Sequence, residues 1–212
     1  MAIQEKYMNK GKKPGMKLGI TGGIGSGKTC VCRVFNVLGI PVFSADLEAK
    51  EIMNYDKRII RRINSIAGKD LYSDGNLNRP ELAAIIFNNN TLLEEVNSLV
   101  HPIVFENFRK WEMEQSAPYV IMEAAIMFES GASKLVDRVA TVVAPVGERM
   151  DRVISRNQLT KEQVLERMRN QMDDESRIKL SDYVINNSEN DMIIPAILKI
   201  HEDLLTYVNT NL

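Results

Sequence analysis

Eight consecutive residues near the beginning of the chain have the types and spacing of a phosphate-binding loop. The pattern G-x-x-x-x-G-K-[ST] is matched by Gly22-Gly23-Ile24-Gly25-Ser26-Gly27-Lys28-Thr29. Glycines let backbone N–H groups turn toward a polyphosphate, because no Cβ atom stands in the way. Lysine supplies a compact cation for the β- and γ-phosphate oxygens, and threonine supplies a hydroxyl ligand for Mg²⁺. We therefore predict a site for ATP and Mg²⁺, with Lys28 also catalytic and Thr29 bound to the metal, formed by Gly23, Ile24, Gly25, Ser26, Gly27, Lys28 and Thr29.

The residues on either side of this loop supply the context that it needs. An apolar run at Lys17–Thr21 predicts a buried strand that ends at the glycine cluster. Residues 28–38 carry apolar side chains three and four positions apart, which predicts an amphipathic helix. This helix begins at the loop, so its N-terminal amides and its dipole face the same anion. The context favours a nucleotide site over a glycine-rich turn with a surface lysine.

A phosphate loop alone does not distinguish kinases, GTPases and ATP-driven motors. The sequence holds no N-K-x-D run, which a GTPase would use to recognise its base. A motor would need a chain longer than these 212 residues, so a small-molecule kinase fits best. An ATP-responsive binding module without chemistry is the alternative from another class, and release of ADP distinguishes the two.

Two carboxylates follow predicted strands, and each could take part in the kinase reaction. Asp46 comes after a strand at 41–43, at the edge where open α/β sheets bind ligands. We predict that Asp46 orients and deprotonates the acceptor hydroxyl, although a helix at 47–55 would accept the same residue type as its N-cap. Glu123 follows a predicted strand at 119–122 and is predicted to contact Mg²⁺ through water. A plain strand-end charge is the alternative for Glu123.

Three arginines lie along a predicted helix at 148–157. Arg152 and Arg156 are four residues apart and share a helix face, and Arg149 precedes them. Guanidinium groups suit the charge that spreads over a transferring phosphoryl group, so we predict that Arg152 and Arg156 are catalytic and that Arg152 also binds ATP. From 147 to 182 the chain carries eight Arg or Lys and eight Asp or Glu. A solvated charged face is therefore the alternative.

The elements that must position these groups alternate between strand and helix. Further strands are predicted at 138–143 and 182–185, and further helices at 79–87, 91–115, 161–172 and 191–207. This order predicts an α/β fold in three layers, the P-loop kinase fold, around a mostly parallel five-stranded sheet. Helical insertions at about 57–115 and 147–180 are expected to bind the acceptor substrate and to form a lid. We expect residues 1–15 to be a flexible tail and 16–212 to be a single domain.

Composition limits the partners and the location. The chain has 27 Lys and Arg against 28 Asp and Glu, which gives no support to binding of nucleic acid or an anionic membrane. No apolar stretch approaches the ~20 residues of a membrane span, and residues 1–15 lack the apolar region of a secretory signal. Only Cys30 and Cys32 are present; we expect them to pack in a helix, and we expect a cytoplasmic location. The sequence leaves monomer and weak homo-oligomer open.

With these residues in view, the chain from Met16 to about Asn187 resembles the dephospho-CoA kinase family. The stretch Leu18–Thr29 is similar to that family's form of the loop, and Ser44-Ala45-Asp46 stands where the family has D-A-D. The resemblance implies that Asp46 is the general base. Ser44 departs from the family pattern, so the work of the first carboxylate is not carried over.

Other segments of the chain resemble the same family. Leu99-Val100-His101-Pro102 is similar to its L-H-P element, and Ala125-Ile126-Met127-Phe128-Glu129 to P-L-L-F-E with the proline lost. The resemblance implies that His101, Phe128 and Glu129 bind substrate, with a capping or hydrogen-bonded histidine ahead of a Pro-initiated helix as the alternative for His101. It also implies that the R-x-x-x-R of the lid is Arg152 and Arg156. Four polar residues are expected on the adenine side of the ATP site: Gln171, Arg177, Asp182 and Asn187.

The implied reaction is transfer of the γ-phosphoryl group of ATP to the ribose 3′-hydroxyl of dephospho-CoA, which gives CoA and ADP and is the last step of coenzyme A biosynthesis. The implied partners are ATP and dephospho-CoA, and the segment after Asp46 would hold the acceptor. Another P-loop kinase, acting on a nucleotide, shikimate or gluconate, is the alternative within enzymes.

Overall fold

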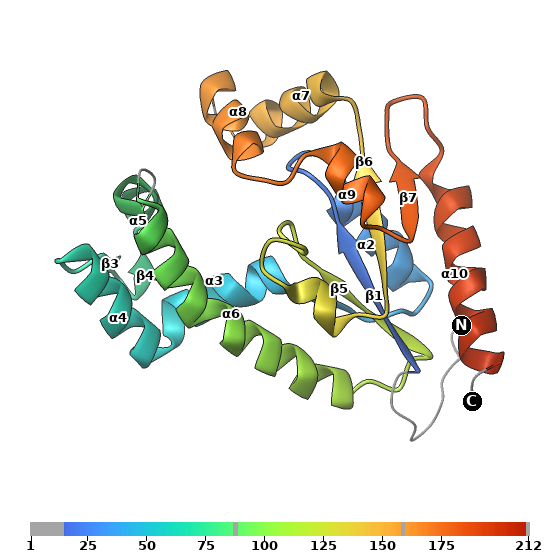
Figure 1. Ribbon diagram of the computed structural model, residues 1–212, viewed down its shortest axis with the longest axis horizontal. Coiled ribbons are helices and arrows are strands. Elements are labelled where there is room, and N and C mark those ends of the chain that lie inside the picture. Colours follow the sequence, from blue (N-terminus) through green and yellow to red (C-terminus); the bar gives the residue numbers. More distant parts are fainter. Residues whose placement is uncertain (1–14, 87–88, 158–159, 211–212) are drawn as a thin grey trace. The chain divides into compact units, whose positions relative to one another are not determined.

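A computed structural model describes residues 15–86, 89–157 and 160–210 (Figure 1). The chain forms two compact units: Met1–Ser44 with Lys110–Leu212, and Ala45–Arg109. The first fourteen residues, most of the predicted tail, lie outside the described residues. The predicted insertion at 57–115 overlaps the second unit, which begins earlier, directly after a strand of the first.

The first unit is built on a five-stranded sheet in the order β2-β5-β1-β6-β7. Every neighbouring pair in this sheet is parallel, which confirms the predicted mostly parallel α/β sheet. β1 is central, so the strands added later in the chain lie on both sides of it. In such sheets ligands bind at the carboxyl ends of the strands where the order reverses, and the phosphate loop follows β1 at that point. The strands are β1 (Met16–Thr21), β2 (Val42–Ser44), β5 (Tyr119–Glu123), β6 (Arg138–Val143) and β7 (Tyr183–Asn186).

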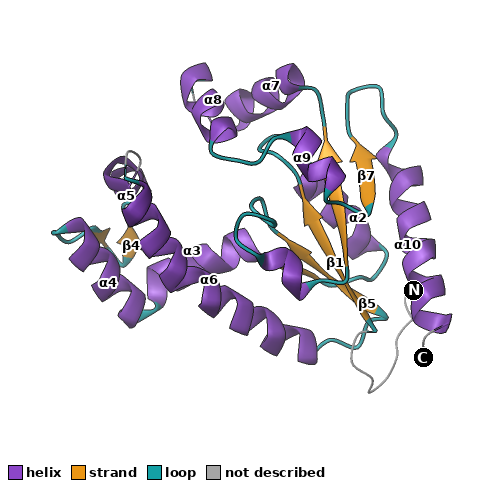
Figure 2. Cartoon of the chain, in the orientation of Figure 1, coloured by secondary structure: helices purple, strands orange, loops and turns teal. Residues whose placement is uncertain are grey.

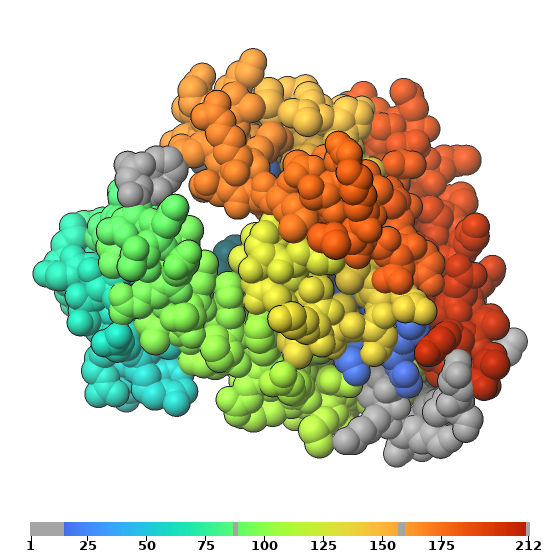
Figure 3. All heavy atoms as spheres, viewed as in Figure 1, coloured from blue at the N-terminus to red at the C-terminus, as the bar shows by residue number. Residues whose placement is uncertain are grey.

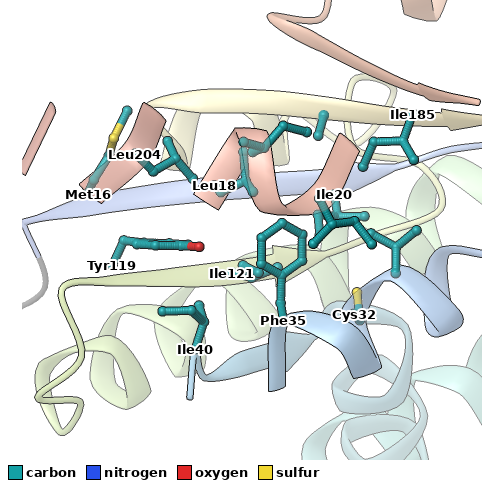
Figure 4. Packing of buried hydrophobic residues seen from close by; sticks show 14 of the residues in the cluster. Met16, Leu18, Ile20, Cys32, Phe35, Ile40, Tyr119, Ile121, Ile185 and Leu204 are labelled. Carbon is teal, nitrogen blue, oxygen red and sulfur yellow. The ribbon is translucent and has the colours of Figure 1, made fainter. Parts of the chain in front are cut away.

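Helices α2 (Lys28–Val37) and α10 (Ile193–Thr210) pack on one face of this sheet. Figure 4 shows Leu18 and Ile121 of the sheet against Phe35 of α2 and Leu204 of α10, all of them buried. The alternation of side chains along β1 turns Gly19 to the opposite face, where Met127 and Val136 lie next to it. The sheet therefore has apolar cover on both faces, as a parallel sheet requires.

Three helices follow β6 and form the predicted lid segment: α7 (Val146–Asn157), α8 (Lys161–Arg169) and α9 (Asp174–Lys179). The predicted helix at 161–172 is too long, because α8 ends at Arg169 and Asp173 begins a new helix by accepting a hydrogen bond from Ser176 N at 2.8 Å. A short 3₁₀ helix, η1 (Ala132–Leu135), lies in the connection between β5 and β6. Glu129, shortly before η1, accepts a hydrogen bond from Met172, shortly before α9. The two segments are yellow and orange in Figure 3.

The second unit contains α3 (Ala45–Tyr55), α4 (Lys57–Ala67), α5 (Arg79–Ile86) and most of α6 (Asn90–Met113). It also contains a hairpin of β3 (Tyr72–Ser73) and β4 (Asn76–Leu77), visible in Figure 2. The hairpin is an addition to the helices expected in this segment. The turn residues Asp74 and Gly75 both have positive φ, 50° and 77°, and an Asp-Gly pair in that conformation closes a two-residue hairpin. Among the described residues, no helix is long and apolar enough to cross a membrane.

Candidate active site

The phosphate loop connects the carboxyl end of β1 to the N-terminus of α2. Gly25 and Gly27 have φ values of 80° and 96°, a left-handed conformation that glycine adopts without steric cost. Gly27 is the N-cap of α2 and has no side chain to occupy the first amides of the helix. The first turn of α2 therefore presents its N–H groups and the positive end of its dipole at the loop. This is the geometry that binds phosphate groups.

Lys28 and two buried hydroxyl groups complete the loop. Lys28 Nζ donates to the carbonyl oxygen of Gly22 at 2.9 Å, so the ammonium group lies back across the loop. Thr29, the second residue of α2, is exposed. Ser26 Oγ and Thr21 Oγ1 are buried and have no hydrogen-bond partner within the part of the chain that the structure describes. Such orphaned polar atoms are uncommon in folded proteins and mark this end of β1 as a polar site.

The side chains of Ser44 and Glu123 meet beside the loop, at the carboxyl ends of β2 and β5. The two residues are partners in the sheet register, and Ser44 Oγ donates to Glu123 Oε2 at 2.8 Å. The pKa of the Cys32 thiol is raised to about 12, mainly by burial and also by the nearby charge of Glu123, while the charge of Lys28 opposes the shift. A carboxylate and an ammonium group therefore flank the same position on α2. No cluster of three or more His, Cys, Asp or Glu side chains in the described ranges could hold a metal by itself.

Arg152 and Arg156 both lie on α7, as predicted. Arg152 Nη2 donates to Glu148 Oε2 at 2.8 Å, and the same oxygen accepts the backbone N–H of Glu189 at 3.0 Å. Arg152 Nη1 is buried and makes no hydrogen bond to any described residue. Arg152 is half-buried, and its partner Glu148 also bonds to the segment after β7. Arg152 is therefore not part of a solvated charged face. Arg156, one turn later, is exposed.

Arg149 is a residue of this site that sequence reasoning did not assign. It is 4% exposed and donates from Nε to the carbonyl oxygen of Ile24 at 2.9 Å. Gln171 Oε1 accepts the backbone N–H of the same residue at 2.8 Å. Asn187 Nδ2 donates to the carbonyl oxygen of Ser26 at 2.7 Å. The predicted Gln171 and Asn187 therefore both contact the loop backbone, and the spacing of Arg149, three residues before Arg152, was the signal that could have added it.

Two other residues expected on the adenine side bond to other parts of the first unit. Asp182 directly precedes β7, and its place beside adenine stays a prediction. Its carboxylate accepts the N–H of Val139 at 2.8 Å and pairs with Arg138 at 3.4 Å, because a strand start leaves backbone donors to satisfy. Arg177 is 1% exposed and donates from Nη1 to Asp174 Oδ1 at 2.6 Å, behind the loop.

Phe128 and Glu129 lie in the connection after β5. Glu129 Oε1 accepts the backbone N–H of Met172 at 2.8 Å, so this carboxylate holds the segment between α8 and α9. Phe128 is half-buried. The structure thus adds a structural contact at Glu129 to its predicted role in substrate binding.

Asp46 and His101 belong to the second unit. Asp46 is the second residue of α3, inside its first turn, and no described group forms a hydrogen bond with its carboxylate. An N-cap would precede the helix and bond to its amides, so Asp46 does not act as that cap. His101 lies in the middle of α6, which continues through Pro102, so the alternative of a capping histidine is wrong. Its ring stacks on Phe105 with centroids 6.1 Å apart, and burial lowers the pKa of His101.

Comparison with known proteins gives one consistent result. The family model described as dephospho-CoA kinase matches residues 16–192. A dephospho-CoA kinase of Bacteroides fragilis is 38% identical over 186 residues, which are 87% of this chain and 91% of that protein. One from Porphyromonas gingivalis is 37% identical over 190 residues, 89% and 94% of the two chains.

Solved structures share the fold of this chain. A crystal structure from Thermus thermophilus superposes with a TM-score of 0.78 at 29% identity, over 92% of this chain and 98% of that one. A dephospho-CoA kinase from Campylobacter jejuni shares the fold, with a TM-score of 0.64 at 24% identity over 90% and 98% of the chains.

Proposed function

This chain belongs to the dephospho-CoA kinase family, and we propose that it transfers the γ-phosphoryl group of ATP to the ribose 3′-hydroxyl of dephospho-CoA, giving CoA and ADP. The family predicted from the motifs is confirmed, and so is the P-loop kinase fold. The chain is accordingly an ATP-dependent kinase of coenzyme A biosynthesis that acts on a hydroxyl group. The observation that carries the proposal is the loop of Lys28, set at the N-terminus of α2 and facing a helix that carries arginines.

The loop and its neighbours are assigned to ATP. The amides of Gly25, Ser26, Gly27, Lys28 and Thr29 would surround the phosphates, and Gly23 would let them approach closely. Ile24 contributes by holding the shape of the loop, because its backbone N–H and its carbonyl oxygen are both bonded to protein side chains. Lys28, Arg152 and Arg156 would neutralise the charge of the transferring group, since phosphoryl transfer depends mainly on positioning and electrostatics. Asn187 would act through its bond to Ser26.

The residues beside the loop fit Mg²⁺. Oxygen ligands are what Mg²⁺ prefers, and it keeps several waters while one or two protein groups and the substrate phosphates hold it. Thr29 would supply a hydroxyl ligand, and Glu123 would act through water, with Ser44 holding its carboxylate. The bound metal would supply charge neutralisation at the phosphates.

The second unit is assigned to the acceptor. Asp46 would orient the 3′-hydroxyl and accept its proton, and its carboxylate has no hydrogen bond to any described residue that would compete with this role. His101 would contact the substrate as a neutral imidazole, because burial lowers its pKa. Phe128 and Glu129 of the first unit would shape the acceptor site, and closure of the segment after β6 would keep water from the phosphoryl group.

The remaining expectations concern the partners, the cellular location and the oligomeric state of the chain. We expect small-molecule substrates, neither nucleic acid nor a membrane as partner, and a cytoplasmic location. Both a monomer and a weak homo-oligomer fit the chain.

An acceptor panel tests the proposed function. Purified protein is incubated with MgATP and, separately, dephospho-CoA, nucleoside monophosphates, shikimate and gluconate, while ADP release is followed. We expect turnover with dephospho-CoA, and mass spectrometry should show CoA with its new phosphate on the 3′ position. Turnover of another acceptor in place of dephospho-CoA would contradict the acceptor. Nucleotide binding without ADP release from any acceptor would support a binding module.

A further inference from the structure

The two backbone polar groups of Ile24, inside the phosphate loop, are hydrogen-bonded to side chains from distant parts of the chain. The N–H donates to Gln171 at 2.8 Å and the carbonyl oxygen accepts from Arg149 Nε at 2.9 Å. The two partners are 147 and 125 residues away in sequence. The peptide groups on either side of Ile24 are therefore held in place by the protein itself, before any nucleotide binds.

The charge of Arg149 is buried and has one matched partner. Its Nη1 donates to Asp174 Oδ2 at 2.6 Å, and the other oxygen of Asp174 accepts from Arg177 Nη1 at 2.6 Å. A buried guanidinium group is costly unless it is paired and hydrogen-bonded, so the position of Arg149 depends on Asp174. Burial lowers the pKa of Arg149, while the charge of Asp174 opposes that shift.

Arg149 also packs directly against the loop. A Cβ atom added to Gly23 would collide with Nη2 of Arg149, and one added to Gly25 would collide with the Arg149 carbonyl oxygen. Two glycines of the motif are thus required by the fit of Arg149 as well as by any approach of phosphate. The side chain supports the loop through direct contact, rather than lying across a solvent gap.

We propose that Arg149 and Asp174 are positioning residues for the phosphate loop: Arg149 fixes the carbonyl group of Ile24, and Asp174 fixes Arg149, so that the loop amides are held in the conformation that accepts the phosphates of ATP. This role differs from that of Arg152 and Arg156, which are assigned to the phosphates themselves. It rests on the proposed function only in taking ATP as the ligand of the loop. Its effect falls on the nucleotide and not on the acceptor.

The test compares Arg149→Met and Asp174→Asn with Arg169→Met, a change at an exposed residue of α8. Binding of a non-hydrolysable MgATP analogue is measured by calorimetry, and KM is measured for both substrates. We expect Arg149→Met to weaken nucleotide binding and raise KM for ATP by about 10-fold, because a charged hydrogen bond to the loop is lost. Asp174→Asn should cause a rise of about 3-fold, since an acceptor remains, and Arg149→Lys should recover part of the loss. KM for dephospho-CoA should stay within about 2-fold of the parent in every variant.

Hydrogen exchange supplies a readout that general destabilisation would not mimic. In Arg149→Met the amides of residues 22–27 should exchange faster than in the parent, while those of β1 keep their rates. Unchanged nucleotide affinity together with unchanged loop exchange would overturn the proposal. So would an equal rise of KM for both substrates accompanied by a lower Tm.

Two further outcomes are covered by the same design. If Arg149→Met does not fold, the nearly isosteric Asp174→Asn carries the test with the same readouts. If the parent binds nucleotide but does not turn over dephospho-CoA, the proposed acceptor is wrong. Nucleotide affinity and loop exchange still decide the role of Arg149 in that case.

Discussion

The two units of the chain are stabilised in different ways. In the first unit, side chains bond to the loop backbone from residues 125, 147 and 161 positions away, and two arginines are buried. In the second unit the ion pairs are at the surface, with Arg58 bonded to Asp56 and Arg62 to Glu95 at 2.7 and 2.9 Å. Its interior is apolar, and its buried side chains include Ile52, Ile59, Ile63, Val96 and Val104.

This difference indicates where the chain requires fixed geometry. Surface ion pairs contribute about 0–1 kcal/mol each, so those of the second unit do little to fix one conformation. Both units have an apolar core, but in the first unit partly buried hydrogen bonds with the side chains of Arg149, Gln171 and Asn187 also fix the backbone of the loop. The half assigned to the nucleotide is therefore held by directional contacts, whereas the half assigned to the acceptor relies mainly on apolar packing.

Lys28→Ala should have the largest effect on kcat, because it removes the ammonium group of the phosphate loop in the first unit. We expect kcat to fall by about 10²-fold or more, as when a donor to a transition-state anion is deleted. Steady-state ADP release measures it, with Lys134→Ala, at an exposed lysine of η1, as the control. A kcat within a few-fold of the parent would show that the loop does not carry the chemistry.

Asp46→Asn tests whether the second unit contributes chemistry. The amide keeps the shape and loses the base, so kcat should fall on the order of 10²-fold while KM for ATP stays within about 2-fold. Glu51→Gln, at an exposed position of the same helix, is the matched control. Parental turnover of Asp46→Asn would mean that this unit only binds the acceptor and that the base lies elsewhere.

The sequence predicted the first unit better than the second for a physical reason. The loop is a local motif: its glycines, Lys28 and the flanking strand and helix are all set by adjacent residues. The apolar runs of the five strands also predict a buried parallel sheet directly. In the second unit the hairpin was missed, although Asp74-Gly75 marked its turn, because strands of two residues carry no periodicity.

What the sequence could not supply is long-range pairing. Gln171 and Asn187 were expected at the nucleotide by resemblance, but their bonds to Ile24 and Ser26 depend on how the sheet brings distant segments together. The spacing of Arg149 placed it on the same helix as Arg152, but its burial against the loop depends on the fold. The bond of Asp182 to the N–H of Val139 depends on the same long-range arrangement of strands.

Ser44→Ala should have a moderate effect on the Mg²⁺ requirement. It changes the residue of the first unit that stands where the family pattern has an aspartate. The mutation removes the hydroxyl that donates to Glu123, while the carboxylate remains. We expect the Mg²⁺ concentration for half-maximal rate to rise by about 3-fold, because a hydrogen bond to a charged group then no longer orients Glu123. A Mg²⁺ titration of the rate measures this, with the exposed Ser65→Ala as control. An unchanged requirement would place Glu123 outside the metal's surroundings.

The smallest effect we expect is a difference between the units in acid. Burial lowers the pKa of His101 in the second unit and of His201 in the first below the ordinary 6.5. The unfolded chain then binds more protons than the folded one, so stability present above pH 6.5 is lost as the pH falls through that value. The Tm should fall by a few degrees between pH 7.5 and 5.5, more through His201, which is hydrogen-bonded to the buried Tyr119 at 2.7 Å, than through the half-buried His101. Carboxylates such as Asp56, whose pKa is lowered to about 2, lose their contribution to stability only at lower pH.

Thermal melts of His201→Gln and His101→Gln should each show a smaller fall in Tm over this pH range. An undiminished fall in Tm in the double variant would assign the effect to other groups.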